Sequence, residues 1–246
     1  MNNKIPKRLK KEPLIESLWE IRFSSTVSSV AELLPGLLYR QFEADCPTVE
    51  PLPTVNVPLA VRQIDQNFRY LPTMKLEGAP YSIQIGEHVV SLSCRRPYTG
   101  WPKFGSKILE LAKALKDTKL LTNLERFSMK YIDVLPMSGT PTIAPLSATI
   151  SLGGHDIGEN SIHLRSERSE NEFINIVQIM SPTEVKLPGG EKFNGILIDI
   201  DTVYLRKSAD LWINFDARLN EAHDINKKVF FELLRPETLE GLEPEY

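Results

Sequence analysis

The sequence predicts an α+β protein of two sheet-and-helix lobes with mainly antiparallel strands. In the first half, two amphipathic segments lie between runs of alternating apolar and polar residues, which predicts the order β-α-β-β-α-β. In the second half, similar runs follow one another over short connections, and short connections favour an antiparallel β-meander. A long helical pattern ends before Pro236 and predicts a helix that closes the meander.

The composition is that of a folded globular protein rather than a disordered one. Of the 246 residues, 41% are hydrophobic and 25% are charged, and the net charge of -3 implies no general attraction to nucleic acid or membranes. Apolar runs are much shorter than the roughly 20 residues of a membrane-spanning helix, and no apolar signal segment follows the basic start. Two cysteines, Cys46 and Cys94, are too few for a disulfide framework, so we expect a cytoplasmic protein.

The first half divides into a tail and a lobe. Residues 1–12 are basic, and we expect them to form a flexible tail, whereas residues 13–135 form the N-terminal lobe. The lobe begins with a strand at 18–23, in which apolar and polar residues alternate. The helix expected at 29–42 contains Pro35, which predicts a kink or a break because proline removes a helix hydrogen bond.

A β-hairpin is predicted over residues 81–92. A two-residue turn at Gly86–Glu87 would pair Ile83 with Val90, and all the apolar partners would then share one face. A second helix follows the turn at Gly100, with its apolar residues on one stripe.

The boundary between the lobes is placed in the segment 136–148, which is rich in proline and small residues. In the strand before it, at 125–135, the apolar phase changes, which predicts a bulge or burial of both faces. The C-terminal lobe, 149–246, should contain short strands of which the last two are 195–204 and 211–217.

Three aspartates gather in these last two predicted strands. If the strands pair as a hairpin, Asp199 lies opposite Asp216, and Asp201 lies on the same face. Carboxylates grouped in this way could be the catalytic ligands of a Mg²⁺- or Mn²⁺-dependent nuclease or phosphohydrolase. No phosphate-binding loop or positioned base accompanies them, so a solvated polar face without metal or cofactor is the favoured interpretation. The histidines are scattered and common hydrolase motifs are absent from the sequence, which also argues against a metal-dependent hydrolase.

Two basic segments could contact nucleic acid. The residues of the tail that could bind phosphates are Lys4, Lys7, Arg8, Lys10 and Lys11. Arg95 and Arg96 stand beside Tyr98 and Trp101, a combination that can stack on bases or form a protein interface. The same patterns are typical of a solubilising tail and of aromatic residues that anchor the next helix, and the acidic overall charge favours these readings.

Four short motifs spread over nearly the whole chain are PLIESLWEIRF, YTGW, KYID and ILIDID. In their order and spacing, the chain resembles a sporadically distributed family of uncharacterised bacterial proteins of about this length. The family pattern has arginine and asparagine where this chain has Lys130 and Asp133, and lysine presents a different donor geometry from arginine. The resemblance implies no activity or site residue. The patchy distribution of the family resembles that of phage-defence and toxin–antitoxin genes, so the resemblance implies such a setting.

From these observations we expect a non-enzymatic protein-binding or regulatory component that acts as a homodimer or with a protein partner. The metal-dependent enzyme and the nucleic-acid-binding protein remain the two alternatives.

Overall fold

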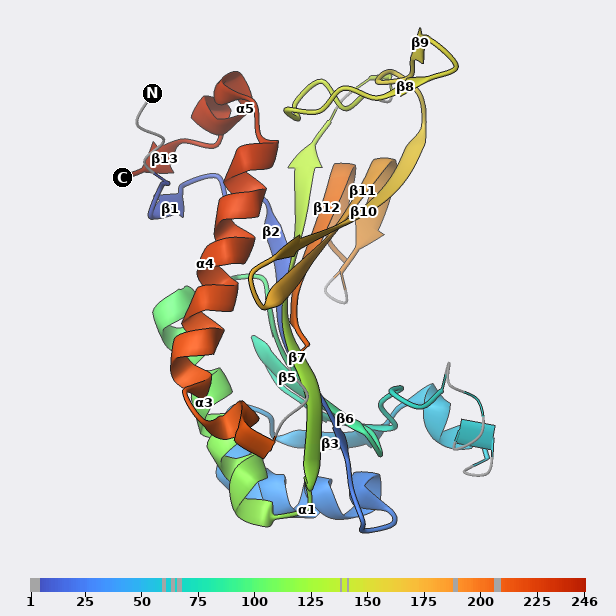
Figure 1. Cartoon of the computed structure of the whole chain (residues 1–246), viewed down its shortest axis with the longest axis vertical. Coiled ribbons are helices and arrows are strands. Elements are labelled where there is room, and N and C mark those ends of the chain that lie inside the picture. The colour runs from blue at the N-terminus through green and yellow to red at the C-terminus, as the bar shows by residue number, and fades with distance from the viewer. Residues whose placement is uncertain are drawn as a thin grey trace. The chain divides into compact units, whose positions relative to one another are not determined.

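The computed structural model describes residues 5–58, 61–62, 65, 68–137, 139–140, 142–187, 190–205 and 209–246. The main strands are β2 (Leu14–Ser24), β3 (Thr48–Pro51), β4 (Met74–Glu77), β5 (Tyr81–Ile85), β6 (Val89–Arg95), β7 (Asn123–Pro136), β10 (Ile162–Glu170), β11 (Phe173–Lys186) and β12 (Lys192–Tyr204). They form one mainly antiparallel sheet in the order β10-β11-β12-β7-β2-β6-β5-β4-β3 (Figure 1). The α+β class that the sequence predicts is therefore confirmed.

Helices and short strands complete the fold. The helices are α1 (Val30–Phe42), α3 (Trp101–Thr118), α4 (Phe215–Leu233) and α5 (Pro236–Gly241), with 3-10 turns η1 (Pro53–Asn56) and η2 (Ala209–Trp212). Two small antiparallel pairs join β1 (Arg8–Leu9) to β13 (Pro244–Glu245) and β8 (Ser151–Leu152) to β9 (His155–Asp156). The predicted β-α-β-β-α-β order is found, with β3 and β4 added after α1. Among the described residues, no helix is both long and apolar enough to cross a membrane.

The chain divides into two compact units, each built from separate segments. Unit 1 comprises residues 1–15, 130–202 and 223–246, and unit 2 comprises residues 16–129 and 203–222. Strands β2, β7 and β12 and helix α4 contribute residues to both units. The lobe boundary expected at 136–148 stays a prediction.

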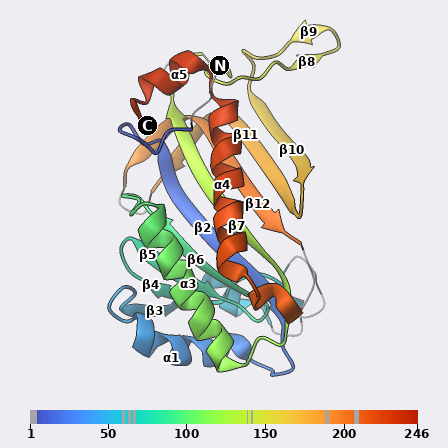
Figure 2. The ribbon, with the colours of Figure 1, turned by 60° about the vertical axis from the view of Figure 1, so that its left-hand side comes forward.

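In unit 2, helices pack against the sheet through aromatic side chains. Helix α1 packs against α3, β4 and β5 (Figure 2). The fully buried ring of Trp19 on β2 meets Phe215 edge to face, with 5.9 Å between ring centroids. Phe127 on β7 also packs against the ring of Phe215, with 5.4 Å between ring centroids. Phe215 therefore anchors the first turn of α4 in the core of unit 2.

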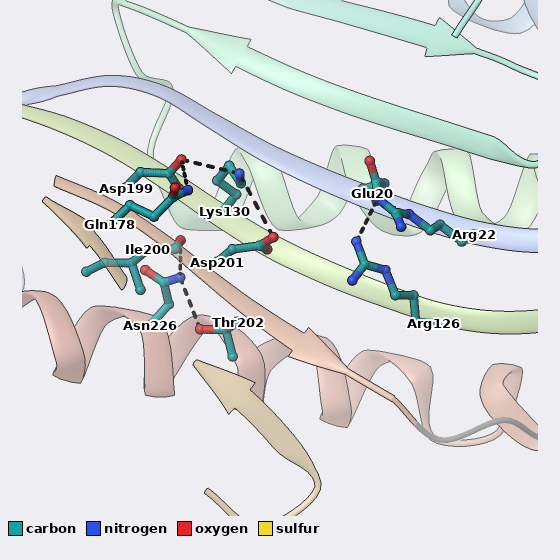
Figure 3. Close-up of polar contacts among 10 residues, drawn as sticks. All are labelled: Glu20, Arg22, Arg126, Lys130, Gln178, Asp199, Ile200, Asp201, Thr202 and Asn226. Carbon is teal, nitrogen blue, oxygen red and sulfur yellow. Dashed lines mark hydrogen bonds and ion pairs between the residues drawn. The ribbon is translucent and has the colours of Figure 1, made fainter. Parts of the chain in front are cut away.

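In unit 1, the second part of α4 is tied to the sheet by buried polar groups. Asn226 Nδ2 donates hydrogen bonds to the Ile200 carbonyl at 2.9 Å and to Thr202 Oγ1 at 3.1 Å (Figure 3). The Thr202 hydroxyl donates in turn to Asn175 Oδ1 at 2.8 Å. A separate apolar cluster forms around Ile15, Val134 and Leu197. On β7, Asp133, Val134 and Leu135 are all buried, which matches the predicted burial of both faces.

Two local predictions differ from the structure, the register of the hairpin and the strand expected at 211–217. The hairpin pairs Ile83 with Leu92, not with Val90, because Gly86 bonds to Val89 as the closing pair and the turn falls one residue later. The pairing shifts by two residues, so the same side chains stay on the same face. Helix α1 runs through Pro35 without a break, and the alternative of a kink stays a prediction.

The largest difference concerns residues 211–217, which are not a strand. Residues up to Trp212 form the turn η2, and α4 begins at Phe215. The buried residues of this stretch recur at helical spacing, and Leu211, Phe215 and Leu219 are all nearly inaccessible. Asn214, with φ of 58°, turns the backbone between the two helical segments. The hairpin that would place Asp216 opposite Asp199 is therefore wrong.

Candidate functional site

Asp199 and Asp201, two of the candidate metal ligands, project from β12 next to a lysine. Lys130 Nζ on β7 lies 3.3 Å from Asp199 Oδ2 and 4.0 Å from Asp201 Oδ2 (Figure 3). Gln178 on β11 donates a hydrogen bond to the same oxygen of Asp199 at 3.4 Å. All three charged side chains are largely buried, so the ammonium group offsets the repulsion between the carboxylates.

The third candidate, Asp216, belongs to the first turn of α4. It therefore does not join the carboxylates of β12 through a hairpin. Across the described part of the chain, no group of three or more histidine, cysteine or acidic side chains is arranged to hold a metal ion. Lys130 places a positive charge beside Asp199 and Asp201, the two β12 residues to which the metal-dependent alternative assigned Mg²⁺ or Mn²⁺.

A surface hollow in unit 2 brings together two residues that the sequence placed in different candidate sites. The hollow has a volume of about 220 Å³, and Trp101 and Asp216 both line it. Its other lining residues are Pro102, Gly105, Ser106, Leu109, Leu219 and Asn220. They come from the N-terminal halves of α3 and α4.

Hydrogen bonds link the polar groups of the hollow as a chain in which Trp101 donates to Asn220 and Asn220 donates to Asp216. The Trp101 indole N–H donates to Asn220 Oδ1 at 3.1 Å. Asn220 Nδ2 donates to Asp216 Oδ1 and to the Asp216 carbonyl, both at 2.8 Å. Asp216 Oδ2 accepts no hydrogen bond from any described residue, so the hollow offers this oxygen to a ligand, next to the residues that line it with Asp216.

The local sequence explains why the indole ring lies where it does. Gly100, with φ of 84°, turns the chain into α3, and Pro102 fits the first turn of a helix because that position needs no N–H donor. One turn later, a Cβ on Gly105 would lie 3.3 Å from two carbon atoms of the Trp101 ring. The missing side chain of Gly105 lets the indole lie against α3.

Asp216 is the one charged residue among those that line the hollow in the described structure. Asp216 is exposed, and Asn220 links it through hydrogen bonds to Trp101, which lines the same hollow. A cation is attracted both by a carboxylate and by the face of an indole ring, and a guanidinium group can use both at once. The hollow is therefore suited chemically to a cationic side chain and not to an anion.

The other candidates around Trp101 have mainly structural contacts. Arg95 forms an ion pair with Glu77 and donates a hydrogen bond to the Gly78 carbonyl at 3.2 Å. The ring of Tyr98 packs edge to face on Phe104, with 6.0 Å between centroids, so it anchors the start of α3. Arg96 is exposed. Of these residues, only Trp101 lines the hollow.

The basic tail is held by the acidic C-terminus of the chain. Arg8 pairs with Glu245 at 3.1 Å, and Lys11 pairs with Glu243 at 2.9 Å. The tail residues Lys7 and Lys10 also bond to this segment, and Lys4 lies outside the described residues. Residues 7–11 thus contact the C-terminal segment, and acidic groups offset part of their charge, whereas the flexibility expected for residues 1–12 stays a prediction.

A charged network on β2 and β7 carried no sequence signal. Glu20 accepts hydrogen bonds from Arg22 at 2.7 Å and from Arg126 at 3.1 Å (Figure 3). Nearby in the same unit, Glu125 accepts a hydrogen bond from the Tyr70 hydroxyl at 2.6 Å. Burial raises the pKa of Glu125, but hydrogen bonds, first that from Tyr70, lower it below its ordinary value. Contacts between strands distant in the sequence create this network.

Unit 1 also contains two buried titratable groups. The Tyr131 hydroxyl lies 2.9 Å from His223 Nδ1, and burial, aided by the charge of Lys227, lowers the pKa of His223 to about 3. Burial, with a smaller effect of Glu12, raises the pKa of Asp133 well above its ordinary value. Burial therefore disfavours the charged form of both groups, the imidazolium of His223 and the carboxylate of Asp133.

In comparisons with known proteins, the chain matches no protein-family model and no curated protein sequence.

Proposed function

We propose that the chain is a non-enzymatic protein-binding component, and that it holds an arginine or lysine side chain of its partner in the hollow between α3 and α4. The observation that carries this proposal is the pairing of a half-buried indole ring with a single exposed carboxylate in that hollow. A protein partner also fits the phage-defence or toxin–antitoxin setting that the family resemblance implies.

The chemistry of the hollow supports a cation more than any other ligand. Arginine stacks its planar guanidinium on an aromatic ring and donates two parallel hydrogen bonds to a carboxylate. Trp101 offers the ring, and Asp216 offers an acceptor that is held in place by Asn220. Aromatic residues are also enriched at protein interfaces, where they contribute a large share of the binding free energy.

The reactive side chains elsewhere support binding rather than catalysis. Asp199 and Asp201 share Lys130 between them. Burial raises the pKa of the Cys46 thiol to about 11, so the thiolate that a nucleophile requires is scarce. His223 shares a hydrogen bond with Tyr131, and burial lowers its pKa to about 3, so its ring stays neutral at neutral pH.

Partner capture from the native host tests the proposal. Tagged wild-type protein should retain a protein at constant stoichiometry, and both Trp101→Ala and Asp216→Asn should lose it. Leu152→Gln is the matched control, because Leu152 is 70% exposed on β8 and lies outside the hollow. Retention of the same protein by both hollow variants, or no retained protein with the wild type, would show that the hollow is not the binding site.

A further inference from the structure

Helix α1 presents an exposed apolar face that is separate from the hollow. Leu33 is 47% exposed and Leu37 is 56% exposed, although both are large and apolar. The opposite side of the helix is buried by Val30, Ala31, Leu34, Leu38 and Phe42. Two leucines spaced four residues apart lie next to each other on a helix surface, so they form one patch.

The residues around this patch are arranged symmetrically about a glycine. Glu32, Gly36 and Arg40 form one ridge along the helix, and Leu33 and Leu37 lie on the adjacent ridge. A Cβ on Gly36 would meet no atom within 4 Å, so this position leaves a notch between two charged side chains. Glu32 precedes the notch by four residues, and Arg40 follows it by four.

We infer that this face of α1 binds the same face of a second copy of the chain, with the two helices antiparallel and crossing at Gly36. In a twofold interface, a contact from residue i to residue j of the partner is always repeated from residue j to residue i. With the axis at Gly36, Glu32 of one copy therefore faces Arg40 of the other, and the reverse pair forms at the other end. Each notch receives a leucine of the opposite copy. Ridges of this kind pack at a crossing angle of about -50°.

Charge complementarity selects a second copy over other occupants. Within the described part of the chain, neither Glu32 nor Arg40 has an ion-pair partner, and a copy of the same helix supplies both. The two charges also complement the dipole of their own helix. The dipole explains neither the exposed leucines nor the glycine between the charges. A second copy explains the leucines, the glycine and the two opposite charges together.

The dimer should be weak, because one helix face buries less than the area of a standard interface. Sedimentation velocity over a concentration series measures it directly, with circular dichroism to confirm folding. We expect a concentration-dependent monomer–dimer equilibrium, and we expect Leu33→Gln with Leu37→Gln to raise its Kd by at least about tenfold. Leu152→Gln, an exposed apolar control on β8, should leave the Kd unchanged.

A charge swap distinguishes a specific twofold interface from general stickiness. Glu32→Arg or Arg40→Glu alone places like charges at both ends of the interface, so each should weaken the dimer about tenfold. The double variant with both changes restores opposite charges and should return the Kd to within about threefold of the wild type. A monomer at every concentration, a dimer unaffected by the leucine changes, or a double swap weaker than either single change would overturn the inference. The hollow is not altered by these variants, so partner capture tests the proposed function separately.

Discussion

At the scale of single residues, Lys130 explains how two aspartates can share one buried face of the sheet. Its ammonium group lies within 4.0 Å of both Asp199 and Asp201, and Gln178 donates to one of them. A buried carboxylate without a compensating charge lowers the free energy of unfolding, so the two carboxylates depend on the lysine for their stability in this position. The sequence analysis noted the two acids and Lys130 separately but did not bring them together, because Lys130 lies on a strand distant in the chain.

Lys130→Met should lower the free energy of unfolding by about 1 to 3 kcal/mol, because it removes the cation and leaves both carboxylates in place. Lys130→Arg keeps the charge and should cost less. In a triple variant that also carries Asp199→Asn and Asp201→Asn, most of the loss should be recovered, since no charge is then left unpaired. Urea unfolding at neutral pH measures all three. Equal stability of Lys130→Met and the wild type would contradict the electrostatic role.

His223 should make the protein sensitive to mild acid. Its pKa is about 3 in the folded protein, against an ordinary value of 6.5. Between these values the unfolded chain binds a proton that the folded chain does not, so stability should fall as the pH decreases from 6.5 towards 3. His223→Asn cannot take up that proton, and its stability should depend less on pH over this window. Urea unfolding at pH 7 and pH 4.5 compares the two proteins, and parallel losses would argue against the assignment.

At the scale of elements, the strands and helices were predictable where one periodicity dominates. Alternation predicted β2 and the hairpin β5–β6, and the apolar stripe predicted α1 and α3. The start of α4 was not predictable in this way, because its apolar residues fit both an alternating strand and a helix. In the helix, the ring of Phe215 packs against Trp19 and Phe127. These residues are distant in the sequence, so their contacts cannot be read from the local pattern.

The pairing of β1 with β13 has a measurable electrostatic consequence. Glu243 and Glu245 pair with Lys11 and Arg8, so Glu243→Gln with Glu245→Gln should free two cations and raise the affinity for duplex DNA several-fold at low salt. The control, Glu191→Gln with Glu221→Gln, changes the net charge by the same amount at two exposed positions with no ion pair among the described residues. Fluorescence anisotropy in a salt series gives both affinities. Equal changes in the two double variants would mean that only the net charge matters.

At the scale of the whole molecule, the fold class was readable from the sequence, whereas the candidate site was readable only in parts. Trp101 and Asp216 each stood out, but as members of different candidate sites 115 positions apart, and no sequence pattern joined them. Two local signals hinted at their roles. Gly105 follows Trp101 by one helical turn, and Asn220 follows Asp216 by the same spacing, at which side chains on a helix meet.

The central claim is that the hollow binds a cationic side chain, and the indole N–H signal of Trp101 in NMR tests it most directly. A short blocked peptide with one arginine should shift this signal, with a Kd of about millimolar order for a single side chain. The same peptide with citrulline, which has nearly the same shape but no charge, should not shift it. Asp216→Asn should abolish the response to arginine. An unchanged Trp101 signal with the arginine peptide, or equal shifts with both peptides, would contradict the account.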